Sequence, residues 1–292
     1  DSGIHIYTHG DLLSAHSYPE LRKFPHLVGS YGGAWQSQQR DFAAFPGPIL
    51  VNSNCPFEPG ESYRDRLFTL GRAGRPGIRT IMNSDFSALI EAARELPGFR
   101  ETAKNLTVTT GFSGDAVQAL SGRLTGAIRE GAIRHLFLLG GCNGTSPGHH
   151  YYSEFVECVP RETVILTLGC IKHRFNGRVS GAIGAIPRLL DVGQCHDSYS
   201  MIKLAVTMTE GLECRLSELP ITLMVSGFEQ RVIAVLLTLS ALGFENIRLG
   251  PDLPAFLSPP VLKRLKTAFN IQLITTPEAD IEAALHRPSA PG

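Results

Sequence analysis

Hydrophobic positions gather in short runs that alternate with amphipathic stretches, most regularly in the second part of the chain. The apolar runs there cover 106–110, 135–140, 163–168, 221–226, 246–250 and 271–275. The stretches with helical spacing cover about 114–130, 150–158, 199–213, 229–242 and 259–268. Strand-like runs that alternate with helices are typical of βαβ units and a parallel sheet. This part of the chain is therefore predicted to form an α/β lobe.

The first part of the chain has shorter and less regular runs. Strands are expected at 4–8, 48–53, 66–71 and 80–83, and helices at 36–42 and 86–96, the latter with Asp85 or Ser84 as N-cap. The glycine-rich stretch 29–35 lacks the Gly-Lys-Ser/Thr ending of a phosphate loop, and it predicts a tight turn before a helix.

We expect two Rossmann-like three-layer lobes with mainly parallel sheets, at 1–108 and 109–286, and a disordered tail at 287–292. The helix at 259–268 has a clear start signal, because Ser258 can cap it and Pro259 occupies its first position.

Composition narrows the class of protein. The chain has 292 residues, 43% of them hydrophobic, and no net charge, which suits two globular lobes and gives no basic surface for nucleic acid. No apolar run has transmembrane length and no secretory signal is present. Six cysteines in a chain of this length do not indicate a disulfide scaffold, so a cytoplasmic location is expected. Because the chain begins with Asp1 and a strand follows almost at once, we expect it to be part of a longer protein cut on its N-terminal side.

Reactive side chains follow the expected strands or precede the expected helices. Six of them do so: Asp11, Cys55, Cys142, Cys170, Cys195 and Glu229. Loops at the carboxyl ends of parallel strands line the ligand crevice of open α/β folds. If the two lobes face each other with these ends inward, four thiols and two carboxylates meet at one site.

Four thiolates at one site indicate a metal centre, since thiolates are soft ligands for iron, zinc or copper. A catalytic zinc ion takes three protein ligands and a water, so four thiolates fit a cluster of several irons better. Each cysteine taken alone is more often a small buried apolar group, so the prediction rests on their collective placement. Cys158 and Cys214 are interpreted as structural.

Other residue types have simpler explanations. Glu229 is also explained by the preference for a carboxylate at a helix start, worth roughly 0.3–1 kcal/mol, and Asp11 by a turn. His9, His16 and His173 are expected to be hydrogen-bonded residues rather than ligands, and the adjacent pair 149–150 points in different directions on a helix. The stretch 181–184 lacks the full dinucleotide fingerprint.

The motifs that contain these residues resemble one family. The matching stretches are 7–16, 54–55, 62–66, 140–144, 169–176, 193–199, 228–230 and 249–259. In them the chain resembles the hybrid cluster proteins, also called prismane proteins, which act as hydroxylamine reductases. The resemblance covers essentially the whole chain, and it extends more distantly to nickel–iron carbon monoxide dehydrogenases.

The resemblance implies a hybrid iron–sulfur–oxygen cluster between the two lobes. It implies Cys55, Cys142, Cys170 and Cys195 as cysteine ligands, with Cys142 at the position that carries a persulfide in the family. Glu229 matches a carboxylate ligand. Two positions depart from the family: Asp11 stands where the family has a glutamate that contacts the cluster, and Arg231 stands where it has a lysine close to the cluster.

Part of the family pattern lies upstream of this chain. The family's histidine ligand and its N-terminal helical domain, which carries a second, electron-relaying iron–sulfur cluster, have no counterpart in these residues. The chain therefore resembles the last two domains of such a protein.

The family's reaction is the reduction of hydroxylamine to ammonia and water, and nitric oxide reduction is associated with it in nitrogen oxide detoxification. By resemblance, Asp11 and Glu229 are the catalytic candidates for proton supply, and a redox partner protein delivers electrons. Two alternatives stay open: a carbon monoxide dehydrogenase-like enzyme, which nickel would reveal, and a non-catalytic iron–sulfur binding module or fragment.

Overall fold

The structure is a computed structural model of the chain. It describes residues 3–52, 58–71, 74–101, 107–112, 114–142, 150–175, 178–227, 230–253 and 257–286. The chain divides into two compact units: unit 1 is Asp1–Ala15 with Pro19–Thr107, and unit 2 is His16–Tyr18 with Val108–Gly292. The expected tail at 287–292 lies outside the described residues.

Unit 1 contains two small parallel sheets. β1 (Ile6–Thr8) pairs with β2 (Leu27–Ser30), and β3 (Ile49–Val51), β4 (Leu67–Leu70) and β5 (Arg79–Ile81) form a second sheet in that order. The helices are α1 (Gln38–Ala44) and α2 (Ser87–Glu95), with the 3-10 helices η2 (Trp35–Ser37) and η3 (Glu61–Arg66). The 3-10 helix η1 (Gly10–Ser17) begins in unit 1, and its last two residues are assigned to unit 2. A small core of buried side chains from α1, η3, β3 and β4 joins the second sheet to α1.

Unit 2 is built around one six-stranded sheet in the order β10-β7-β6-β11-β12-β13, with every pair parallel. The strands are β6 (His135–Gly141), β7 (Thr163–Leu168), β10 (Leu189–Asp191), β11 (Ile221–Ser226), β12 (Ile247–Leu249) and β13 (Gln272–Leu273). The short hairpin β8 (Ala182–Ile183) and β9 (Ile186–Pro187) lies apart from it.

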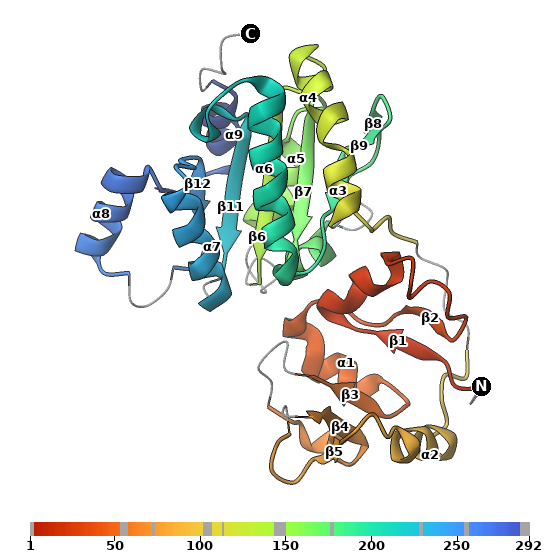
Figure 1. Cartoon of the computed structure of the whole chain (residues 1–292). Coiled ribbons are helices and arrows are strands. Elements are labelled where there is room, and N and C mark those ends of the chain that lie inside the picture. Colours follow the sequence, from red (N-terminus) through yellow and green to blue (C-terminus); the bar gives the residue numbers. More distant parts are fainter. Residues whose placement is uncertain are drawn as a thin grey trace. The chain divides into compact units, whose positions relative to one another are not determined.

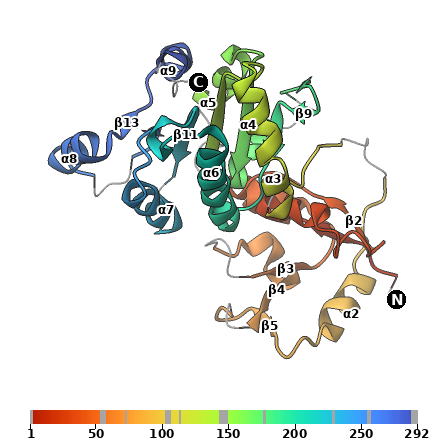
Figure 2. The same cartoon turned by 45° about the horizontal axis from the view of Figure 1, so that its top comes forward.

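Helices cover both faces of this sheet, so unit 2 has three layers. α3 (Asp115–Ala119), α4 (Ser121–Arg129), α6 (Ser198–Leu212) and α7 (Gln230–Ala241) pack on one face, and α5 (Tyr151–Cys158) and α9 (Pro277–Leu285) on the other (Figure 1). Figure 2 shows α4 and α6 side by side on the first face. α8 (Pro259–Phe269) is the most exposed helix, with only Leu265 and Phe269 packed against the core.

The side chains of the central strands divide between the two faces by strict alternation. Leu136 and Leu138 of β6 enter the core beneath α4 and α6, whereas Phe137 and Leu139 enter the core beneath α5 and α9. Because both faces are buried, the strand reads as a continuous apolar run in the sequence. The α/β class with mainly parallel sheets is thus confirmed.

The expected strand at 106–110 is wrong for the residues that are described. Residues 107–112 form no ladder; instead the Thr110 hydroxyl donates to Asp191 Oδ2 at 2.5 Å and the Phe112 amide donates to Asp191 O at 3.0 Å. β-branched residues favour strands only where a neighbouring strand accepts their backbone groups. Here the end of β10 accepts only the Thr110 hydroxyl and the Phe112 amide, and no ladder forms.

Other boundaries differ locally. The expected helix at 114–130 is two helices, α3 and α4, with Leu120 between them. β2, β10, the β8–β9 hairpin and α9 were not expected. Ser258 is the N-cap residue of α8 as predicted, although its side chain makes no capping hydrogen bond. At α2 the cap position is Phe86, while Asp85 Oδ1 accepts from the Ser87 amide at 3.1 Å. No helix in the described ranges is long and apolar enough to cross a membrane.

Candidate metal centre

Three of the predicted cysteines lie at the carboxyl edge of the large sheet. Cys142 follows the end of β6, Cys170 lies in the 3-10 helix η6 (Gly169–Arg174) directly after β7, and Cys195 opens the 3-10 helix η7 (Cys195–Asp197) after β10. Cys142 is 5% exposed, Cys170 is 2% exposed and Cys195 is half-buried. Since β10, β7 and β6 are adjacent and parallel, their carboxyl ends bring these three residues to one edge.

Backbone contacts join the Cys170 and Cys195 segments. The Gly169 amide donates to Gly193 O at 3.1 Å. A Cβ atom on Gly169 would lie 2.6 Å from Cys195 Sγ, and Gly169 has a φ of +80°. A glycine is therefore required here twice over, for the left-handed backbone and for the thiol that lies against it. The turn that carries Cys170 thus directly faces the Cys195 thiol.

Cys142 is held at the next strand. Its amide donates to Ser226 O at 3.1 Å, at the end of β11. A Cβ on Gly141 would lie 1.6 Å from the same Ser226 oxygen, so the ends of β6 and β11 approach more closely than any side chain would allow. Glu229 follows shortly after Ser226, but it lies outside the described residues.

Local chain features support the Cys195 turn. The Gln194 amide donates to Asp197 Oδ2 at 2.7 Å, and the Gln194 side chain accepts from the Asp197 backbone in a capping box. This reciprocal pair fixes the first turn before α6. Cys195 therefore lies in a closed turn with little freedom of its own.

An apolar cavity of about 80 Å³ lies between the sheet and helices α6 and α7. Its lining is almost wholly hydrocarbon and includes Leu138, Leu223, Met201 and Val235. Cys195 also borders it, which connects the cavity with the carboxyl edge of the sheet. Such a cavity favours small apolar molecules over water.

Sequence analysis missed a buried ion pair beneath this edge. Lys172 Nζ lies 2.7 Å from Asp191 Oδ1, and the two side chains are 1% and 6% exposed. Both residues lie close to predicted ligands, but they are far apart in the chain and no spacing rule relates them. Only the adjacency of β7 and β10 could have revealed the pair.

The predicted residues of unit 1 are only partly described. Asp11 is half-buried in the first turn of η1, where its backbone oxygen accepts from Ser14 Oγ at 3.3 Å. Cys55 lies outside the described residues, as do Glu229 and the side chain of Arg231 at the start of α7 in unit 2. That these residues complete a site with the three thiols stays a prediction.

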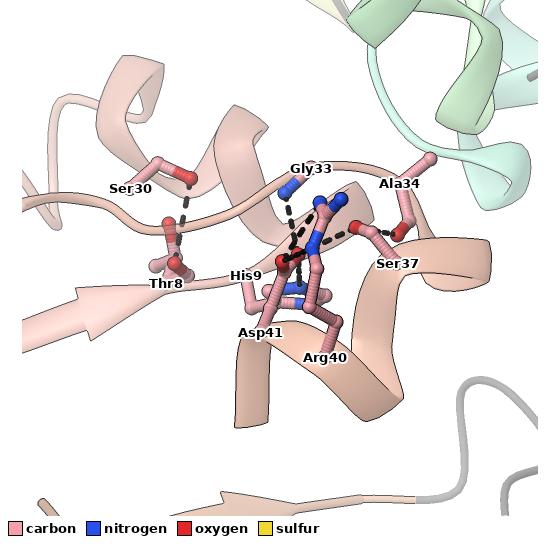
Figure 3. A network of polar contacts seen from close by, with 8 residues as sticks. All are labelled: Thr8, His9, Ser30, Gly33, Ala34, Ser37, Arg40 and Asp41. Atoms are coloured by element: carbon pink, nitrogen blue, oxygen red, sulfur yellow. Dashed lines mark hydrogen bonds and ion pairs between the residues drawn. The ribbon is translucent and has the colours of Figure 1, made fainter. Parts of the chain in front are cut away.

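Beside Asp11, His9 takes part in a polar network around Asp41 (Figure 3). His9 Nε2 lies 3.1 Å from Asp41 Oδ2, which also accepts from the Ser37 hydroxyl at 2.5 Å and the Gly33 amide at 3.0 Å. Arg40 donates to Asp41 Oδ1 through Nε at 3.2 Å and Nη2 at 3.1 Å.

The network determines how Asp41 titrates. Burial by itself raises the pKa of the Asp41 carboxyl, but the hydrogen bonds from Ser37, His9, Gly33 and Arg40 together outweigh it and hold the pKa below its ordinary value. His9 is thus a hydrogen-bonded residue, as the sequence predicted, and its network ties the end of β1 to α1.

In the described ranges, no three His, Cys, Asp or Glu side chains approach as ligands of a single metal ion would. In a cluster each iron is anchored separately, so the thiol ligands stand further apart than the ligands of a single metal ion do.

Comparison with known proteins gives one family. The model of the Prismane/CO dehydrogenase family matches residues 1–282. A relative from Burkholderia lata named hydroxylamine reductase is 55% identical over 289 residues, which are 99% of this chain and 52% of the relative. A hydroxylamine reductase from Moorella thermoacetica is 53% identical over 284 residues, 97% of this chain and 66% of the relative.

Solved structures agree on the fold. Carbon monoxide dehydrogenase IV from Carboxydothermus hydrogenoformans superposes with a TM-score of 0.68 at 19% identity, over 88% of this chain and 50% of that one. At this identity the match concerns the fold alone. The chain spans 52% of the length of the Burkholderia lata relative, so the activity of a whole relative applies to it only as a proposal.

Proposed function

Because this chain belongs to the Prismane/CO dehydrogenase family, we propose that it forms the iron–sulfur part of an oxidoreductase that reduces hydroxylamine to ammonia and water. The observation that carries the proposal is the edge of the large sheet, where Cys142, Cys170 and Cys195 end three adjacent strands. The identity of 55% to a hydroxylamine reductase supports the same conclusion.

The donor set fits an iron–sulfur group. Thiolate sulfurs are the usual ligands of such clusters, and two of the three thiols are almost fully buried, which keeps water away from the sulfur. Because residue 169 is a glycine, its backbone approaches Cys195 Sγ with no side chain between them. In the proposal, Cys55, Glu229 and Asp11 complete the ligands and Arg231 stays near the group.

The proposed group is a hybrid iron–sulfur–oxygen cluster, which when bound would supply stored electrons and open iron positions for a small N–O substrate. The residues of this chain would hold it, exclude water and deliver protons. Reduction of hydroxylamine breaks the N–O bond and consumes two electrons and two protons, giving ammonia and water.

Proton delivery requires a carboxyl group near the reacting oxygen, and Asp11 and Glu229 are the candidates. If Asp11 supplies a proton, Asp11→Ala should lower turnover by about 10²–10⁴-fold. Its effect on folding should be small, since Asp11 is only half-buried. Turnover at the parent rate in Asp11→Ala would remove Asp11 from the site.

Nitric oxide is a second candidate substrate, favoured by the apolar cavity beside Cys195. A neutral, weakly polar diatomic molecule enters hydrocarbon-lined space that excludes hydroxylamine. Filling the cavity with Val235→Phe should therefore slow nitric oxide reduction and leave hydroxylamine reduction unchanged. Equal slowing of both reactions would show that the cavity does not distinguish them.

Electrons must reach the site from outside the residues described. We propose that a redox partner protein supplies them, through a second iron–sulfur cluster in the N-terminal part that the family resemblance implies. If this proposal is right, the extended form of the protein should accept electrons faster than this chain alone.

The test is anaerobic purification followed by assays of iron, nickel and acid-labile sulfide. It uses this chain and an extended form, to which the part of the Burkholderia lata relative that this chain does not match is fused. Several irons with sulfide and no nickel support the proposal. Nickel would instead favour a carbon monoxide dehydrogenase-like enzyme, and iron without turnover would favour a non-catalytic module.

A matched pair of variants controls the assay. Cys170→Ser should lose iron, whereas Cys158→Ser should retain it, because Cys158 is exposed on α5 and away from the carboxyl edge. Absence of iron from both parent forms would refute the enzyme proposal.

A further inference from the structure

The buried pair Lys172–Asp191 joins the chain segments that carry the two cysteine turns. Lys172 belongs to η6, the 3-10 helix that contains Cys170, and Asp191 ends β10, shortly before Cys195. Lys172 Nζ and Asp191 Oδ1 are 2.7 Å apart with 1% and 6% of the side chains exposed. The pair therefore crosses from one cysteine segment to the other.

Both charged groups also bind Gly193, which lies between Asp191 and Cys195. Lys172 Nζ donates to Gly193 O at 2.7 Å, and the Gly193 amide donates to Asp191 Oδ1 at 3.1 Å. The Gly169 amide donates to the same Gly193 oxygen at 3.1 Å. Every backbone polar group of Gly193 is thus held by the ion pair or by the Cys170 turn.

The far side of Asp191 is fixed as well. Asp191 Oδ2 accepts from the Thr110 hydroxyl at 2.5 Å, and its backbone oxygen accepts from the Phe112 amide at 3.0 Å. Neither the carboxylate nor the strand end can move without breaking several bonds together. The Asp191 carboxylate is therefore held from both sides, by Thr110 at Oδ2 and by Lys172 and Gly193 at Oδ1.

The position of Gly193 matters because the Cys195 thiol has little space. Its Sγ atom lies where a Cβ on Gly169 would approach to 2.6 Å. If the Gly193–Cys195 segment shifts by about half an ångström relative to Gly169, the packing of Cys195 Sγ against the Gly169 backbone changes. The relative placement of the Cys170 and Cys195 turns is therefore sensitive to the pair beneath them.

A purely stabilising role does not explain a buried ion pair, because the cost of removing both charges from water offsets most of their attraction. An apolar pair of similar volume would stabilise the fold as well. What apolar residues cannot supply is direction: a lysine that donates to two oxygens and a carboxylate that accepts from three donors fix angles as well as distances.

From this geometry we propose that Lys172 and Asp191 are positioning residues, which set the Cys195 thiol against the Cys170 turn in the arrangement that binds the cluster. They hold the thiols without touching the substrate. The effect of the pair on cluster binding rests on the proposed function. Its effect on the order of the Cys170 and Cys195 turns does not, and it can be measured in the chain without metal.

The test uses Lys172→Met/Asp191→Asn, which removes both charges together and keeps similar volumes. The matched control is Arg248→Met/Asp280→Asn, which removes another buried pair of unit 2, with Nη1 and Oδ1 also 2.7 Å apart and side chains 15% and 1% exposed. The control pair lies at β12 and α9 and bonds none of residues 168–175 or 189–195.

The first readout is amide hydrogen exchange in the metal-free chain. We expect the Gly169 and Gly193 amides to exchange at least tenfold faster in the Lys172/Asp191 variant than in the parent, with β11 unchanged. Alkylation of Cys195 should accelerate as well. The control variant should leave both readings at parent values. Parent-like exchange at Gly169 and Gly193 in the Lys172/Asp191 variant overturns the proposal.

The second readout is the iron content and the electron paramagnetic resonance spectrum of the extended form after anaerobic purification. We expect the Lys172/Asp191 variant to contain less than a third of the parent iron, and its remaining cluster to give an altered electron paramagnetic resonance signal, while the control keeps both. Faster exchange with parent iron, spectrum and turnover would mean that the pair is merely structural, and would also overturn the proposal.

Two further outcomes remain decisive. If the double variant does not fold, Asp191→Asn alone is measured in its place, because Lys172 then keeps its bond to Gly193 O. If the parent itself binds no iron, the proposed function fails, and the exchange and alkylation rates of the metal-free chain still decide whether the pair positions the Cys195 thiol.

Discussion

Two buried carboxylates organise the two regions that carry predicted ligands, and they do so differently. Asp41 in unit 1 and Asp191 in unit 2 are similarly buried, at 6% and 5% exposed. Asp41 is held by Ser37, Gly33, His9 and Arg40, and the Arg40 side chain is 80% exposed, whereas Asp191 faces a lysine that is itself buried.

The two carboxylates differ in the donors that each keeps after one partner is removed. Without His9, Asp41 keeps the Ser37, Gly33 and Arg40 donors, most of them close by in the chain. Without Lys172, Asp191 keeps hydrogen bonds but loses the only buried cation that the structure shows beside it. Unit 1 therefore has a locally redundant network, and the cysteine edge of unit 2 depends on one long-range pair.

The largest difference between the two regions should appear when each buried carboxylate loses one of its partners. Lys172→Met should destabilise unit 2 by about 3–5 kcal/mol, because it leaves a buried carboxylate without its cation. His9→Phe, which retains the aromatic contact with Phe42, should cost unit 1 about 1–3 kcal/mol.

Urea unfolding measures both variants. Fluorescence of Trp35, the single tryptophan, reports unit 1, and hydrogen exchange of β6 and β7 peptides reports unit 2. Equal costs in the two units would contradict the distinction between a redundant network and a single pair.

The next largest effect concerns Gly169. Gly169→Ala places a methyl group against Cys195 Sγ, so it should destabilise unit 2 by about 1–3 kcal/mol through overpacking, in addition to the backbone cost. Gly184→Ala is the matched control, since Gly184 also has a positive φ, +57°, but open space around its Cβ position.

Thermal unfolding and iron content together measure this effect. Gly169→Ala should lose iron in the extended form, and Gly184→Ala should pay only the backbone cost of about 1–2 kcal/mol and keep its iron. Identical behaviour of the two variants would mean that the thiol tolerates displacement.

A smaller effect is expected from acid in unit 1. The hydrogen bonds to Asp41 hold the pKa of its carboxyl below the ordinary value in the folded chain, while an aspartate in an unfolded chain titrates at about 3.9. The contribution of Asp41 is therefore fully present above pH 5 and disappears as the pH falls below about 4 through the folded pKa.

Asp41→Asn should accordingly flatten the acid limb of unit 1 stability, followed through Trp35 fluorescence between pH 6 and pH 3. Asp85→Asn is the comparison variant: the Ser87 side chain and amide also lower the pKa of Asp85, but in an exposed position where solvent screens the effect, so it should flatten the acid limb less than Asp41→Asn does. A steeper acid limb in Asp41→Asn than in the parent would contradict the assignment.

The smallest effect should come from the two cysteines outside the edge. Cys158→Ala and Cys214→Ala should change unfolding free energy by no more than about 0.5–1 kcal/mol and leave the iron content of the extended form unchanged. Cys158 is exposed and donates to Glu278 Oε1 at 3.3 Å. Loss of iron in either variant would add that thiol to the site.

Much of unit 2 could be predicted because its strands are buried on both faces. β7 and β11 have the predicted bounds, 163–168 and 221–226, since a continuous apolar run leaves few alternatives. The error at 106–110 has the opposite cause: its threonines favour a strand locally, but Asp191 takes the Thr110 hydroxyl. α9 was missed although Thr276 and Pro277 form a start signal, with Thr276 Oγ1 accepting from the Ala279 amide.

From the sequence alone follow the α/β class, the family, the placement of Cys142 and Cys170 at strand ends and that of Cys195 before a helix, because these depend on local patterns of burial and on motif residues. Two contacts depend on the folded arrangement of the strands: Gly169 lies against the Cys195 thiol, and Lys172 forms an ion pair with Asp191. These contacts arise when β10 pairs with β7. Residues distant in the chain become neighbours only through strand order, and no local propensity encodes that order.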